Sequence, residues 1–301
     1  LIVQVVDTSA GIKQRINLLT PLDKRSILKD HIWDDLFKKY STVKTTYPIS
    51  WSKFFSSFSY AIEKNNVKKT NMVALARMNR KAAAEGRYAL YNSFRTKNLA
   101  PDTVYLIDPA HIIHLKHLFQ NKNVGFFYRD NFWAMVTNEK TLMNDNDKLR
   151  FNEIGFKLLD FDKNTDLNFA KKDSYYSFGW SHNSQKSGIW SEGPISTLLF
   201  RTKKNYRDLK LEILCKPYIT KKNGSVELDI FVNDSFNKNI KLTNKNQGQK
   251  IEILIEKKLV KNNEIKVDFN FKNPISPYEV LESPDSRKLG ILIKSIKISP
   301  I

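Results

Sequence analysis

The spacing of apolar side chains divides this chain into two parts with different predicted structures. In the first part, apolar runs such as Leu1–Val6 and Thr103–Ile107 alternate with segments such as Asp30–Tyr40 that have apolar residues at helical spacing. The runs predict buried strands, and the helical spacing predicts helices with one apolar face. Strands separated by helices of this length predict an α/β domain at residues 1–140, with a parallel or mixed sheet flanked by helices. Further helices are predicted at Trp51–Lys64, Arg80–Phe94 and Ala110–Phe119, and further strands at Met72–Ala76, Val124–Tyr128 and Phe132–Val136.

The pattern changes at about residue 174, after a stretch at 141–173 that is rich in Asn, Asp and Lys and predicts a connection between domains. Leu209–Ile213 and Ile265–Phe269 alternate apolar with polar side chains, which is the period of a half-buried strand. Asn223-Gly224 lies between two such runs and favours a tight β-hairpin. We therefore predict an antiparallel, jelly-roll-like β-sandwich at residues 174–301. Its strands are expected at Ile195–Phe200, Leu209–Cys215, Val226–Val232, Ile251–Ile255, Glu264–Phe271 and Leu289–Ile298.

The composition gives the chain a strong positive charge. The 301 residues contain 50 Lys and Arg against 31 Asp and Glu, a formal net charge of +19, and 39 of the 50 basic residues are Lys. Phosphate recognition favours the fork of Arg, and neither a zinc-finger spacing nor an RNP-type aromatic motif is present, so we predict no nucleic-acid partner. The excess favours a solvated Lys-rich surface, with attraction to an anionic glycan or lipid surface as the alternative.

The sequence lacks the motifs that several kinds of site would require. The single cysteine, Cys215, excludes an intrachain disulfide and a cysteine-based zinc site. No glycine-rich phosphate loop supports nucleotide binding. Three histidines, His111, His114 and His117, share one predicted helix without an interleaved carboxylate, so we predict no metal and no cofactor. No apolar run reaches the roughly 18 residues of a membrane-spanning helix.

The densest cluster of aromatic and polar residues lies between residues 175 and 193. Within it Trp180 and Trp190 offer faces that can stack on sugar rings, while His182 and Glu192 can hydrogen-bond sugar hydroxyls. These four residues form our candidate carbohydrate site. The alternative is that both Trp side chains fill the end of the sandwich core.

Near the end of the chain, Asp285 and Arg287 stand two residues apart in a predicted turn before the last strand. We expect them to pair with each other or with the backbone and so to hold that strand in place, with contact to a ligand as the alternative.

Short motifs in both halves of the chain resemble one bacterial family when they are taken in order. The second half carries Gly179-Trp180-Ser181, Trp190-Ser191-Glu192-Gly193, Val232-Asn233, Ser276-Pro277 and Asp285-x-Arg287-x-Leu289-Gly290. The first half carries Gln4-Val5-Val6-Asp7, Ala74-Leu75-Ala76-Arg77 and Pro101-Asp102-Thr103-Val104-Tyr105. The pattern resembles the soluble extracytoplasmic C-terminal region of bacterial multi-pass membrane proteins, glycosyltransferase-like, that assemble surface polysaccharides such as O-antigen.

The resemblance implies an α/β domain and a β-sandwich module on the periplasmic face of the inner membrane, attached through a transmembrane region that would precede Leu1. The implied partners are a glycan or lipid-linked saccharide, that transmembrane region and an anionic membrane surface. The resemblance implies no catalytic residue in this chain. We therefore expect the chain to bind or orient a glycan or a lipid-linked acceptor during cell-surface glycan assembly.

Two alternatives stay open. Ser9 after the first predicted strand, with Asp108 and His111 after a later one, has the layout of SGNH-like esterases, in which Ser attacks an acyl carbon, His takes its proton and Asp orients the His. Acyl groups on glycans would be its substrates. The other alternative is a structural or interaction module without catalysis.

Overall fold

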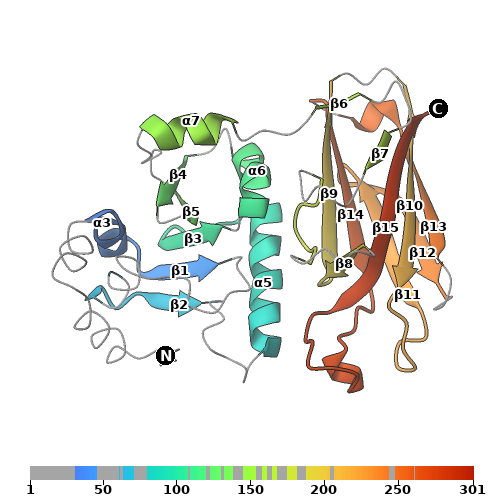
Figure 1. The fold of residues 1–301 in the computed structure, drawn as a ribbon, viewed down its shortest axis with the longest axis horizontal. Coiled ribbons are helices and arrows are strands. Elements are labelled where there is room, and N and C mark those ends of the chain that lie inside the picture. Colours follow the sequence, from blue (N-terminus) through green and yellow to red (C-terminus); the bar gives the residue numbers. More distant parts are fainter. Residues whose placement is uncertain are drawn as a thin grey trace, which may run out of the picture. The chain divides into compact units, whose positions relative to one another are not determined.

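The computed structural model of the protein divides the chain into two compact units, one formed by Leu1–Ile112 with Leu118–Phe151 and the other by Ile113–His117 with Asn152–Ile301 (Figure 1). The structure describes residues 31–45, 61, 64–70, 80–107, 109–119, 123–129, 132–137, 145–153, 158–160, 165–167, 175–181, 188–203, 207–243, 248–260 and 262–301. The predicted strands Leu1–Val6 and Met72–Ala76 and most of the predicted helix Trp51–Lys64 lie outside these residues.

A mixed five-stranded sheet forms the centre of the first unit, with strand order β2-β1-β3-β5-β4. Strands β2, β1 and β3 run parallel, whereas β5 is antiparallel to both β3 and β4. The strands are β1 (Thr42–Thr45), β2 (Lys68–Thr70), β3 (Thr103–Ile107), β4 (Val124–Arg129) and β5 (Phe132–Thr137). The helices in this part of the chain are α3 (His31–Lys39), α5 (Arg80–Arg95), α6 (Pro109–Leu118) and α7 (Asp145–Glu153).

Aromatic side chains pack the helices of this unit onto its sheet. Trp33 of α3 is fully buried and meets Phe127 of β4 edge to face, with 5.2 Å between ring centroids. Phe94 of α5 meets Tyr105 of β3 in the same way at 5.5 Å. The predicted strand Thr103–Ile107 is confirmed and is buried at every position, because helices cover it and antiparallel and parallel neighbours flank it.

The second unit is a β-sandwich of two five-stranded sheets, which confirms the predicted sandwich. One sheet has the order β13-β10-β15-β7, with β8 also paired to β15, and the other has the order β12-β11-β14-β9-β6. The first sheet consists of β7 (Thr165–Leu167), β8 (Ile189–Glu192), β10 (Leu209–Pro217), β13 (Gln249–Ile255) and β15 (Leu289–Pro300). The second consists of β6 (Leu158–Leu159), β9 (Ile195–Thr202), β11 (Val226–Val232), β12 (Ser235–Leu242) and β14 (Glu264–Phe271). Two short 3₁₀ turns complete the unit, η2 (Lys257–Leu259) and η3 (Tyr278–Val280).

The alternation of apolar and polar residues places the core between the two sheets. Along β10, Leu209, Leu211 and Ile213 are buried, while Lys210 and Glu212 point outward. All six strands predicted in this half of the chain are present. Strand β12 was not predicted, because as an edge strand it is largely polar and has few apolar residues to reveal its period.

The predicted hairpin at Asn223-Gly224 is wrong. The segment that contains it joins β10 to β11, and these strands lie in opposite sheets. The tight hairpin of this region is at Asn233-Asp234, between β11 and β12, where both residues have positive φ, +46° and +68°. Such a turn needs two left-handed residues, which Asn and Asp tolerate better than most side chains.

The predicted connection at 141–173 contains regular structure of its own. Helix α7 lies within it, as do the short strands β6 and β7, which join the sandwich at β9 and β15. Helix α7 and strand β7 have few apolar residues, so the sequence pattern gave little sign of them, whereas β6 lies within the apolar run Phe156–Phe161, which is compatible with a strand.

On the outward face of the sandwich, Glu212 lies between two lysines. Lys210 Nζ is 2.8 Å from its carboxylate, and Lys250 forms a second ion pair. Hydrogen bonds from these two lysines lower the pKa of Glu212 from 4.5 to about 2. Because the folded pKa lies below the unfolded one, the interaction stabilises the fold above about pH 4.5 and is lost as the pH falls toward about 2.

We therefore expect Glu212→Gln to lower the urea midpoint of the second unit at neutral pH and to lower it progressively less as the pH falls through this range. Urea titrations of both proteins at several pH values measure the difference. Glu256→Gln, which removes a carboxylate paired with Lys258 alone, is the matched control. A difference between wild type and Glu212→Gln that stays constant with pH would contradict the assignment.

Candidate functional site

Trp180, one of the predicted carbohydrate ligands, lies in the core of the sandwich. It is 3% exposed, and its Nε1 donates to the carbonyl of Thr197 at 2.7 Å. Its ring meets Tyr176 and Phe269 edge to face, with centroids 5.2 and 6.0 Å away. A ring enclosed in this way offers no face to a sugar, so the core interpretation applies to Trp180.

The local backbone explains why Trp180 turns inward. The segment before it runs along the edge of β9, where Thr197 N donates to the carbonyl of Phe178. Gly179 then adopts φ +80°, and its carbonyl accepts hydrogen bonds from Ser196 Oγ and from Glu192 N, both at 2.6 Å. The turn at this glycine directs the next side chain between the sheets.

The other predicted ligands are distributed differently. Glu192 is buried, with 3% of its surface exposed, and His182 lies outside the described residues. Trp190 is partly exposed. It lies on β8, where it is paired with Leu292 of the neighbouring strand β15. Three of the four candidate residues are described, and among these three only Trp190 has a surface that a ligand could reach.

Trp190 packs against an aromatic residue that the sequence analysis did not select. Its ring meets Tyr218 edge to face, with 5.9 Å between centroids and an interplanar angle of 87°. The hydroxyl of Tyr218 donates to Glu282 Oε2 at 2.7 Å. Burial and the neighbouring Glu282 carboxylate raise the pKa of Tyr218, so its hydroxyl stays protonated and remains a donor.

Glu282 belongs to a loop, residues 275–288, that many internal hydrogen bonds hold in place. Ser276 and Glu279 form a reciprocal cap, in which Ser276 N donates to Glu279 Oε2 at 2.8 Å and Glu279 N donates to Ser276 Oγ at 3.2 Å. Tyr278 N donates to the carbonyl of Asp285 at 2.8 Å. The loop therefore presents its side chains from a fixed backbone.

Asp285 and Arg287 pair with each other in this loop. Arg287 Nε is 2.9 Å from Asp285 Oδ1, and Nη2 is 2.5 Å from Oδ2, which is the two-pronged geometry that Arg favours with carboxylates. Arg287 Nη1 also donates to Ser181 Oγ at 2.6 Å. The pair thus ties the loop to the segment that carries Trp180.

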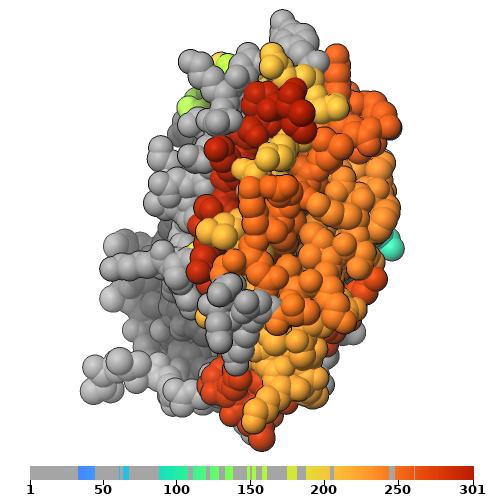
Figure 2. All heavy atoms as spheres, turned by 90° about the vertical axis from the view of Figure 1, so that its right-hand side faces the viewer, coloured from blue at the N-terminus to red at the C-terminus, as the bar shows by residue number. Residues whose placement is uncertain are grey.

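These loops meet at one end of the sandwich, which we call the aromatic end and define as Trp190, Tyr218, Tyr278, Glu282 and Arg287. The loop at 218–225 and the loop at 275–288 lie side by side there, at the bottom of Figures 1 and 2, away from the C-terminus. Tyr278 is 55% exposed. The aromatic end thus combines reachable ring surface with a carboxylate, a phenol and a guanidinium.

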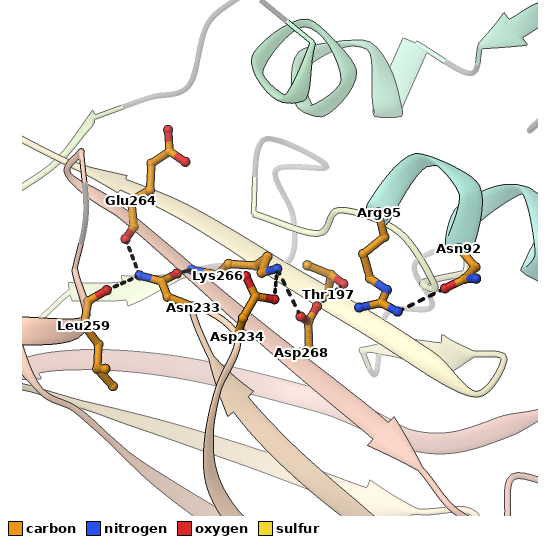
Figure 3. Close-up of polar contacts among 9 residues, drawn as sticks. All are labelled: Asn92, Arg95, Thr197, Asn233, Asp234, Leu259, Glu264, Lys266 and Asp268. Carbon is orange, nitrogen blue, oxygen red and sulfur yellow. Dashed lines mark hydrogen bonds and ion pairs between the residues drawn. The ribbon is translucent and has the colours of Figure 1, made fainter. Parts of the chain in front are cut away.

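A second polar cluster lies on the sheet that contains β9 and β14 (Figure 3). Asp268 is 3% exposed, and it accepts a hydrogen bond from Thr197 Oγ1 at 2.5 Å and lies 3.5 Å from Lys266 Nζ. Asn233 Nδ2 donates to the carbonyls of Leu259 and Glu264 at 2.7 and 2.9 Å. These contacts fasten the β11–β12 turn to β14, so the cluster has a structural explanation.

The residues of the esterase alternative are only partly described. Ser9 and Asp108 lie outside the described residues, and His111 is a buried residue of α6 that meets Tyr91 edge to face at 5.4 Å. The esterase stays a prediction. Among the described residues, no group of His, Cys, Asp and Glu is arranged to hold a metal ion, and no helix is long and apolar enough to cross a membrane.

Comparison with known proteins finds one family model and a set of solved structures similar to this chain. A family model described as the DUF6311 C-terminal domain matches residues 32–137, about a third of the chain. No curated protein sequence matches the chain.

Among solved structures, the chain is similar to the xylan-binding module CBM15, with 12% identity, a TM-score of 0.33 and coverage of 46% of this chain and 97% of that one. It is also similar to a CBM35 from Cellvibrio japonicus Abf62, with 10% identity, a TM-score of 0.30 and coverage of 45% and 92%. The mosquito-larvicidal Cry4Aa toxin from Bacillus thuringiensis is similar at 12% identity and a TM-score of 0.32, over 56% of this chain and 26% of the toxin. Carbohydrate-binding modules thus stand among the structural neighbours, and scores of this size assign no ligand to this chain.

Proposed function

We propose that the second unit is a jelly-roll-like glycan-binding module and that its ligand binds at the aromatic end. The observation that carries the proposal is the partly exposed Trp190 ring set against Tyr218, whose hydroxyl donates to Glu282. Aromatic faces stack on the C–H surfaces of sugar rings, and fixed donors and acceptors beside them recognise hydroxyl groups. Because the loop that carries Glu282 is held by its own hydrogen bonds, little ordering would accompany binding.

The wider setting of this module is part of the same proposal. The chain would be an extracytoplasmic region on the periplasmic face of a bacterial inner membrane, attached to a transmembrane region of a glycosyltransferase-like protein. There the module would bind or orient a polysaccharide or a lipid-linked acceptor during cell-surface glycan assembly. The support for this setting is the order of short motifs described for the sequence, from Gln4-Val5-Val6-Asp7 to Asp285-x-Arg287-x-Leu289-Gly290.

Affinity electrophoresis of the 301-residue chain in gels that contain a neutral polysaccharide (xylan, mannan or laminarin) or an acidic one (alginate) tests the binding. We expect at least one of them to retard the protein. Trp190→Ala should weaken binding by about tenfold or more, because a central aromatic contact often carries a large share of binding energy. Tyr218→Phe, which keeps the ring and removes the hydroxyl, should weaken it several-fold.

Phe236→Ala provides the matched control. Phe236 is an aromatic residue of the same unit, is 62% exposed and lies on β12, beyond the turn at the far end of β11 from the loop at 218–225. Its removal should leave retardation unchanged. If Trp190→Ala stays folded and binds as the wild type does, the aromatic end is not the glycan site.

A further inference from the structure

The outermost part of the aromatic end displays apolar surface to solvent. Leu281, just after η3, is 93% exposed, and Tyr278 within η3 is 55% exposed. Neither residue is needed by the core, which is filled by the inward residues of the two sheets. We use the name tip for Tyr278 and Leu281 together with three lysines of the neighbouring strand end and loop, Lys216, Lys221 and Lys222.

The tip holds Leu281 in an unfavourable backbone conformation. Its φ is +59°, in the left-handed region where residues with a Cβ are disfavoured. The loop maintains this conformation through fixed contacts, with Leu281 N donating to the carbonyl of Tyr278 at 3.2 Å and Glu282 N donating to that of Pro277 at 2.9 Å. Backbone conformations of this kind persist where the surrounding structure holds them, and they cluster at functional sites.

Basic side chains lie on the strand end and loop next to the loop that carries this apolar surface. Lys216 at the end of β10, and Lys221 and Lys222 in the loop that follows, are exposed, and none lies within ion-pair distance of a carboxylate among the described residues. The carboxylates nearby have other partners. Glu279 accepts from Ser276, Glu282 from Tyr218 and Asp285 from Arg287, although the charge of Lys222 also acts on Glu279 and helps to lower its pKa.

We infer that the tip docks the second unit onto an anionic lipid bilayer. Leu281 and Tyr278 would enter the boundary between headgroups and acyl chains, and the three lysines would lie against the phosphates. Two loop ends offer a small projecting surface, whereas a stable protein interface buries about 800 Å² on each partner. Exposed apolar residues at a projecting tip, with exposed lysines on the neighbouring loop, are complementary to an anionic bilayer surface. This inference does not depend on glycan binding.

Vesicle flotation of the full 301-residue chain tests the inference. The probes are phosphatidylcholine vesicles with and without phosphatidylglycerol, in the absence of any glycan. We expect binding to the anionic vesicles that weakens as salt is added. Leu281→Ser should lower the partition coefficient by about tenfold, because a buried Leu side chain would be lost from the bilayer. Replacing Lys221 and Lys222 with Gln should lower it by about fivefold for each residue.

Phe236→Ser is the matched control, since it removes an exposed apolar side chain at the opposite end of β11, and its binding should equal that of the wild type. Absence of wild-type binding, equal binding to neutral and anionic vesicles, or undiminished binding by a folded Leu281→Ser variant would each overturn the inference. Failure of glycan binding with normal vesicle binding would refute the proposed function alone.

Discussion

Trp180→Ala is expected to lower the free energy of unfolding of the second unit by about 3–5 kcal/mol, the usual range for removal of a large buried aromatic side chain. The indole ring fills space between Tyr176 and Phe269, so its loss leaves a cavity. The same substitution removes one of the two donors to the carbonyl of Thr197, which still accepts a hydrogen bond from Ser177 N at 2.9 Å. Trp190→Ala should have a much smaller effect on stability, because Trp190 already has part of its surface in solvent.

The single cysteine provides a direct measurement of this difference. Cys215 is fully buried in the sandwich core, and burial raises the pKa of its thiol to about 12, so it reacts only when the unit opens. The urea dependence of thiol labelling at Cys215 therefore reports the unfolding of this unit alone. If Trp180→Ala and Trp190→Ala shifted the labelling midpoint equally, the structural distinction between the two residues would be wrong.

The contrast between these two Trp residues shows where sequence reasoning reached its limit. Both stand in similar motifs, next to Ser and close to Gly. Which one is buried depends on the pairing of the segment before Trp180 with the edge of β9, a contact between residues about twenty positions apart in the chain. Single-sequence periodicity describes local geometry and does not contain such pairings.

The same limit explains why Tyr218 and Glu282 were missed as site residues. They are 64 positions apart, and the contact between them exists because β10 and β15 are neighbours in one sheet. One local signal was available, the Ser276-x-x-Glu279 spacing of a capping box, which marks a fixed turn before the last strand. Strands with clear alternation, such as β10 and β14, were predictable because one face of each is buried.

Gly179→Ala is expected to destabilise the second unit by about 3 kcal/mol or more, through strain and steric conflict together. Its φ of +80° is unfavourable for any residue with a side chain. An added Cβ would also collide with the carbonyl oxygen of Ile195 and would lie 2.8 Å from Ser196 Cα. Both obstacles are backbone atoms of β9, which cannot move without breaking its ladder with β14.

Gly224→Ala separates these two contributions. Gly224 also has positive φ, +60°, but an added Cβ there meets nothing within 4 Å. That variant should lose only about 1–2 kcal/mol, the penalty of the left-handed conformation. Labelling of Cys215 in urea measures both variants on the same scale. Equal losses would mean that β9 yields to the added methyl group at Gly179, in which case the backbone there does not fix the inward direction of Trp180.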